Sequence, residues 1–180
     1  YEADDPQLME YFTEYKNGYI EIGTRLFDKT VEEGTTEYRL IKAVVLGINY
    51  NLQTYGLSMQ LWDEMGVRLG TTFESHYDRV DIVRKKYLRM FPCITIYQRE
   101  RIREVHDTGQ AELWFGVRRL PIPMKPRGCS KEEYKAWRKH VAHLENEGIN
   151  ARIQNAASYV TGSAMLDVER NLLAHYNLSY

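Results

Sequence analysis

Residues 39–53 read RLIKAVVLGINYNLQ, and the spacing of their side chains decides the fold class. Apolar side chains recur every three or four residues, which is the periodicity of an α-helix that buries one face. They are Ile41, Val44, Val45, Ile48 and Leu52. The opposite side carries mostly polar and aromatic side chains, which are Arg39, Lys42, Leu46, Asn49, Tyr50 and Gln53. This stretch therefore predicts a helix with a basic, aromatic outer face.

Helical signals continue downstream of this stretch. Thr71 with Glu74 fits a capping box, which predicts the start of another helix. That helix should stop before Pro92, because proline disfavours helical geometry in the residue that precedes it. A small strand and loop element is expected near 111–123, so the fold class is mainly α.

The last third of the chain also reads as helix. Ser130 with Glu133 fits a second capping box. We expect Gly148 to end the helix that begins there, since glycine favours the position just after a helix. A further helix is expected from about residue 150 to 176.

Composition excludes several classes of protein. The 180 residues include 24 basic and 25 acidic side chains, so neither a histone-like tail nor an acidic solvating protein is indicated. Two cysteines are too few for a disulfide framework. No apolar run reaches about 20 residues and no signal peptide is visible, so we expect a soluble cytoplasmic protein without membrane contact. Because the chain begins with Tyr1, we expect a piece of a longer protein.

Charge is unevenly distributed along the chain. Residues 1–37 hold 10 acidic and 3 basic side chains, whereas residues 79–127 hold 12 basic and 5 acidic ones. The basic segment would suit a polyanion such as DNA. The alternative is that both segments are simply solvated helix faces.

Lys42, Leu46 and Tyr50 follow one another at intervals of four residues on one helix face. A cation followed by flat apolar side chains suits a phosphate and then a base or sugar. A lysine that is merely solvated is the alternative from the residues alone. No phosphate-binding glycine loop, metalloprotease helix or nucleophile elbow competes with this interpretation.

Residues 42–61 resemble the nucleotide-binding helix of family A DNA polymerases, the bacterial DNA polymerase I type. That motif has a lysine, an aromatic or aliphatic residue four positions later, Tyr-Gly after four more, and a Gly-Leu-Ala-x-x-Leu-like continuation. Three other segments are similar to the family in the right order. Residues 5–27 resemble the region that follows the family's first catalytic motif. Residues 91–121 resemble a segment that ends in a Gly-Arg-Arg-like turn, and residues 149–165 resemble a helix that contains Ile-Asn-x-x-Ile-Gln.

The resemblance implies a DNA-directed DNA polymerase that adds deoxynucleotides to a primer 3′ end. Residues 1–180 would form a single lobe, with the fingers over about 1–120 and adjoining palm helices over about 130–180. Lys42 would be catalytic by neutralising the triphosphate. The implied nucleotide-binding residues are Arg39, Lys42, Leu46, Tyr50 and Tyr19. The implied DNA-binding residues are Arg118, Arg119, Asn150 and Gln154.

Six positions depart from the family pattern and mark a divergent member, of a kind associated with phage replication enzymes. Two of them are Asn155, in place of a glycine, and Asn146, in place of an arginine. Asn51 stands where the family has the glycine after the tyrosine, and Leu46 stands at the aromatic position, which bears on sugar discrimination. Tyr38 replaces an arginine, with Arg39 one place later. Tyr19 replaces a histidine that touches nucleotide phosphate.

The family's metal-binding aspartates lie in motifs before and after the residues of this chain. The resemblance therefore implies Mg²⁺ in the full enzyme, with no metal ligand here, and dNTP as substrate. Implied partners are primer-template DNA and the remaining palm, thumb and catalytic motifs, in a bacterial or phage-infected cell. The chain alone is expected to be inactive. The alternative function is a non-catalytic helical module that binds nucleic acid or protein and keeps only a polymerase scaffold.

Overall fold

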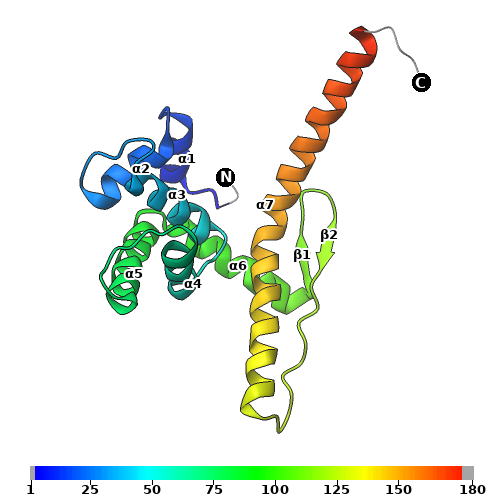
Figure 1. Cartoon of the computed structure of the whole chain (residues 1–180). Coiled ribbons are helices and arrows are strands. Elements are labelled where there is room, and N and C mark those ends of the chain that lie inside the picture. The colour runs from blue at the N-terminus through cyan, green and yellow to red at the C-terminus, as the bar shows by residue number, and fades with distance from the viewer. Residues whose placement is uncertain (1–2, 176–180) are drawn as a thin grey trace. The chain divides into compact units, whose positions relative to one another are not determined.

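A computed structural model describes residues 3–175 and divides the chain into two compact units (Figure 1). The first unit extends to Glu100 and the second begins at Arg101. Helices dominate both units, and one small two-stranded sheet belongs to the second. The mainly α fold class is therefore confirmed. The division into fingers over about 1–120 and palm helices over about 130–180 stays a prediction.

The first unit is built from short helices around one core. Its elements are α1 (Pro6–Thr13), α2 (Gly18–Phe27), α3 (Thr36–Asn49), α4 (Thr54–Met59), the π-helical η1 (Gln60–Glu64), α5 (Phe73–Met90) and the first part of α6 (Pro92–Thr108). Aromatic rings pack together in this core, where Tyr11 and Tyr87 both contact Phe91 edge-on. Burial of these large rings is the main source of stability for such a unit.

Side-chain caps set where these helices begin. Asn17, Thr35 and Thr72 each accept a hydrogen bond from a backbone N–H in the first turn of the helix that follows. The capping box of α5 pairs Thr72 with Ser75. The expected pair of Thr71 with Glu74 is therefore wrong, and the box lies one residue later in the chain. The helix ends at Met90, before the proline, as predicted.

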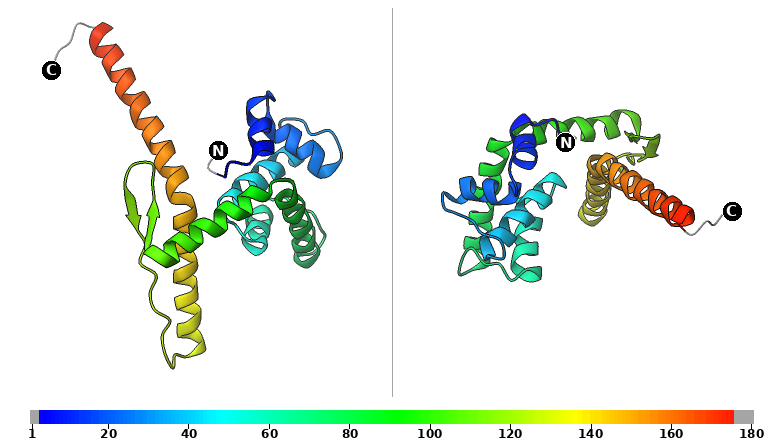
Figure 2. Two further views of the ribbon diagram at one scale, coloured as in Figure 1. Left: turned by 180° about the vertical axis from the view of Figure 1, so that it is seen from behind. Right: turned by 90° about the horizontal axis from the view of Figure 1, so that it is seen from above.

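The second unit pairs a hairpin with a long helix. Strands β1 (Gln110–Glu112) and β2 (Val117–Arg119) run antiparallel, with Ala111 opposite Arg118. β1 packs against α7 (Lys131–His175), and both views in Figure 2 are consistent with the hairpin lying beside that helix. A small core of buried side chains holds them together, which are Val105, Ala111, Leu120, Leu144 and Ala151.

Gly148 does not end a helix, because α7 continues through it, and this expectation is wrong. The physical reason is a contact from outside α7. A Cβ atom at Gly148 would lie 2.4 Å from Cγ2 of the buried Val105. The missing side chain therefore allows close packing of Val105 on the helix. Ser130 and Glu133 do form the predicted capping box, and residue 176, the expected end, lies outside the described residues.

Candidate functional site

One face of α3 is buried and the other is open, as the sequence predicts. Ile41, Val44, Val45 and Ile48 are fully buried in the core of the first unit. Leu46 and Tyr50 are 43% and 41% exposed, and Arg39 and Lys42 are also exposed. The core therefore fixes the rotation of α3, and that rotation presents the predicted binding residues outward.

Tyr19 and Lys42, predicted to act together, lie together in the structure. The Lys42 Nζ is 5.7 Å from the centroid of the Tyr19 ring, which comes from α2. A second ring, that of Tyr38, lies 5.6 Å from the same Nζ. Both separations are within the range of cation–π attraction. From the sequence, Tyr38 is a departure from the family pattern and not a predicted site residue, although its position one helical turn before Lys42 is a signal for contact with that lysine.

The phenol of Tyr19 is partly buried, and burial raises its pKa above the usual value for tyrosine. The neighbouring phenols of Tyr38 and Tyr50 raise that pKa further. Tyr19 is therefore neutral at physiological pH and can donate its O–H to an anion.

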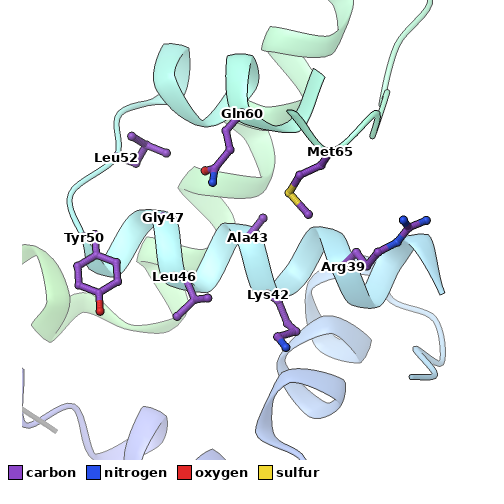
Figure 3. A pocket seen from close by; sticks show the side chains of 9 residues that line it. All are labelled: Arg39, Lys42, Ala43, Leu46, Gly47, Tyr50, Leu52, Gln60 and Met65. Carbon is purple, nitrogen blue, oxygen red and sulfur yellow. The ribbon is translucent and has the colours of Figure 1, made fainter. Parts of the chain in front are cut away.

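Arg39 is directed away from Lys42. Figure 3 shows the Arg39 guanidinium and the Lys42 ammonium on different sides of α3. Both side chains line a cavity of about 630 Å³ whose other wall is formed by Gln60 of η1 and by Met65, which directly follows η1. The other residues that line this cavity are Ala43, Leu46, Gly47, Tyr50 and Leu52. Its apolar walls suit a flat or aliphatic group more than a phosphate.

The departure from Tyr-Gly to Tyr50-Asn51 has a structural explanation. Asn51 has a φ of 62°, in the left-handed region that glycine occupies without strain and asparagine tolerates better than most residues. The N–H groups of Asn51 and Leu52 donate to the carbonyls of Ile48 and Gly47, at 2.9 and 2.7 Å. This is the hydrogen-bond pattern of a Schellman cap. Asparagine thus keeps the backbone turn that follows Tyr50.

The predicted DNA-binding residues all belong to the second unit. Arg118 and Arg119 are exposed on β2, and the Arg118 guanidinium donates to Glu147 of α7 at 2.9 Å. Gln154 is exposed on α7. The Asn150 Oδ1 is buried and accepts no hydrogen bond within residues 3–175. Nucleotide-binding and DNA-binding predictions therefore fall in different units, and their roles stay predictions.

Metal ligands are a separate question. Within residues 3–175, no group of three or more His, Cys, Asp or Glu side chains is arranged to hold a metal ion. In the same part of the chain, no helix is both long and apolar enough to cross a membrane.

Comparison with known proteins identifies the family of this chain. The model of DNA polymerase family A matches residues 2–179, and the chain belongs to that family. It is 30% identical over 173 residues to a DNA polymerase I of Rhizobium leguminosarum, covering 95% of this chain and 15% of that protein. It is 25% identical over 174 residues to a DNA polymerase I of Streptococcus pneumoniae, covering 96% and 17%. The chain thus spans less than a fifth of the length of these relatives.

A solved structure shows the same fold. It is the POL domain of Pol1 from M. smegmatis in complex with DNA primer-template and dNTP. The two chains superpose with a TM-score of 0.67 over 98% of this chain and 27% of that one. Their sequences are 21% identical, so this likeness establishes the fold and not the role of any side chain.

Proposed function

We propose that this chain is the nucleotide- and DNA-binding part of a DNA-directed DNA polymerase, which adds deoxynucleotides to a primer 3′ end in the order of a template. Membership of DNA polymerase family A over residues 2–179 supports this function. The observation that carries it is α3, where Lys42, Leu46 and Tyr50 stand in a row on one exposed helix face.

Lys42 is the proposed catalytic cation. No ion pair to a carboxylate occupies it within the described residues, so its charge is available to a triphosphate. A fixed cation stabilises the charge that develops as a phosphoryl group is transferred. Tyr19 can add an O–H donor beside it. Arg39 points to another side of α3, so a phosphate contact by Arg39 requires its long side chain to rotate.

Leu46 and Tyr50 are proposed to pack against the incoming nucleotide. Each exposes a flat or aliphatic surface within two helical turns of the Lys42 ammonium. Aromatic side chains accept any base by stacking, which suits an enzyme that copies every sequence. An aliphatic residue at Leu46 gives weaker stacking than a ring.

Arg118 and Arg119 are proposed to hold DNA phosphates, and Asn150 and Gln154 to meet base edges in the minor groove. Amide side chains donate and accept, and the minor-groove pattern distinguishes base pairs poorly. A polymerase that tests pair geometry without reading sequence needs that property. Mg²⁺ and its carboxylate ligands are assigned to the remaining palm of the enzyme, together with the thumb.

Lys42→Ala in the intact polymerase tests the nucleotide site. We expect kcat/KM for dNTP incorporation to fall roughly 30- to 1,000-fold, equivalent to about 2 to 4 kcal/mol of lost transition-state stabilisation. Single-turnover primer extension measures the effect. Lys16→Ala, which removes an exposed lysine next to α2, is the matched control and should extend normally. Unchanged incorporation by Lys42→Ala would contradict the proposed function.

Gln154→Ala and Arg119→Ala test the DNA face. Arg119→Ala should lower the salt slope of DNA binding by about one unit, because one phosphate contact releases about one counterion. Gln154→Ala should slow extension from a correctly paired primer while leaving that slope unchanged. Equilibrium binding across a series of salt concentrations distinguishes the two. Wild-type behaviour of both variants would remove this face from the DNA site.

A further inference from the structure

The Lys42 ammonium lies beside two tyrosine rings that come from two different helices. Its Nζ is 5.6 Å from the Tyr38 ring centroid and 5.7 Å from that of Tyr19. Tyr38 precedes Lys42 by one turn of α3, whereas Tyr19 belongs to α2. A ring face attracts a cation that lies within about 6 Å of its centroid. The ammonium is thus restrained from two directions.

The two rings are themselves fixed in place. Tyr19 and Tyr38 meet edge to face, with centroids 6.4 Å apart and planes at 88°. Phe12 of α1 packs edge-on against Tyr19 at 5.2 Å. Edge-to-face contact is a preferred geometry of aromatic pairs. Neither ring can therefore turn away from Lys42 without losing a contact of its own.

Asn17 ties the pair together through its side-chain amide. Its Oδ1 accepts the Tyr19 backbone N–H at 3.2 Å, which also caps α2. Its Nδ2 donates to the Tyr38 hydroxyl at 3.1 Å and to the carboxylate of Glu33. Both amide hydrogens and the amide oxygen are thus used. One side chain fixes the start of α2 relative to a ring on α3.

The environment of Lys42 differs from that of three other lysines in this unit. Lys29, Lys85 and Lys86 each contact a carboxylate, at 2.6, 2.6 and 2.8 Å. Lys42 meets rings, and no ion pair of Lys42 occurs in the described part of the chain. A carboxylate would compete with an incoming phosphate for the ammonium. A ring attracts the cation through its quadrupole but leaves the net charge in place.

We propose that Tyr19 and Tyr38 form an aromatic cradle that positions the Lys42 ammonium for a nucleotide triphosphate without neutralising it, and that Asn17 holds the cradle together. This inference rests on the proposed role of Lys42. Tyr38 and Asn17 act through Lys42 and are positioning residues. The rings occupy the positions where the family pattern has an arginine and a histidine, so two phenol rings replace two nitrogen-bearing side chains.

The first test measures the position of Lys42 without any assay of activity. Ring currents from two nearby faces should shift the ε-methylene resonance of Lys42 upfield of other lysines in a ¹H–¹³C spectrum of the chain. Lys42→Arg removes that resonance and so assigns it. Tyr38→Phe keeps the ring and loses only the hydroxyl that accepts from Asn17, so it should retain more of the shift than Tyr38→Leu. An unshifted Lys42 in the wild-type chain would overturn the cradle, whatever the variants do.

The second test measures the consequence in the intact polymerase. Tyr38→Leu should raise KM for dNTP roughly two- to fivefold, with kcat within about twofold, as expected for loss of one cation–π contact. Tyr38→Phe keeps the ring but loses the hydroxyl that accepts from Asn17, so it should raise KM less than Tyr38→Leu does. Tyr15→Leu removes a tyrosine that contacts Tyr11 and not Lys42, and should leave KM unchanged. A wild-type KM in Tyr38→Leu would overturn the positioning role.

Failure of the cradle and failure of the proposed function give different results. If Lys42→Ala abolishes incorporation while Lys42 shows no ring-current shift, the cradle is wrong and the polymerase function stands. If the shift is present but Lys42→Ala extends primers normally, the proposed role of Lys42 is wrong, and the positioning role falls with it. A shift together with the expected rise in KM supports both.

Discussion

Helices α3 and α7 each carry some of the proposed binding residues, α3 for the nucleotide and α7 for DNA, and the two helices are supported in opposite ways. In α3 buried side chains recur from Leu40 to Ile48, so the core of the first unit sets its orientation over most of its length. Among the described side chains of α7, the buried ones lie between Val141 and Ala151. The described side chains after Ala151 are all half-buried or exposed. Lys42 thus stands over a packed core, whereas Gln154 lies where its helix leaves one.

The largest effect that tests this comparison concerns two glycines of α7. Gly148→Ala should destabilise the second unit by about 1 to 3 kcal/mol, because the new Cβ would meet the stiff, buried Val105. Gly162→Ala should stabilise by up to about 1 kcal/mol, because nothing lies within 4 Å and alanine favours helix. Chemical denaturation followed by circular dichroism measures both. Equal effects would show that the two parts of α7 are packed alike.

A smaller effect is expected at the end of α3. Asn51→Ala should destabilise the first unit by about 1 kcal/mol, since alanine tolerates the left-handed region less well than asparagine. Asn51→Gly is the matched variant and should be neutral or stabilising. Thermal unfolding midpoints of the two variants provide the comparison. If Asn51→Ala is as stable as Asn51→Gly, then the cap does not depend on backbone strain.

The smallest effect is an electrostatic one within the first unit. Hydrogen bonds from Lys85, the larger cause, and from Thr54 lower the pKa of Asp81 below its usual value. The Thr54 hydroxyl donates to the Asp81 carboxylate at 2.9 Å. A carboxyl whose pKa is lower in the folded state stabilises that state above its unfolded pKa, and the benefit disappears as pH falls through the folded value. Asp81→Asn should thus cost less than about 1 kcal/mol at pH 7.

The difference between Asp81→Asn and wild type should shrink as pH is lowered below about 4. Urea denaturation at several pH values measures it. Asp78→Asn removes an exposed carboxylate from the same helix and is the matched control. A constant difference across that pH range would show that the Asp81 charge does not contribute.

Local patterns predicted the helices well and their limits less well. The three-and-four spacing of Ile41, Val44 and Ile48 predicts the buried face of α3. That spacing lies within one helix and can be read directly from the sequence. Thr72 caps α5 where Thr71 was expected, since neighbouring threonines both satisfy the spacing and only the backbone conformation selects one. The sequence predicts that Gly148 ends a helix. The contact that explains this glycine comes from Val105, which lies 43 positions earlier and is not visible in the local pattern.

The sequence by itself determined that this protein is mainly helical, that α3 buries one face, and that its ordered motifs are those of family A polymerases. Helical periodicity and side-chain chemistry are local properties, so they can be read along the chain. Only the tertiary structure decided that Tyr19 of α2 lies over Lys42 and that Asn17 holds Tyr38 beside them. Those contacts join separate helices whose approach is set by core packing, and no spacing within one segment specifies it.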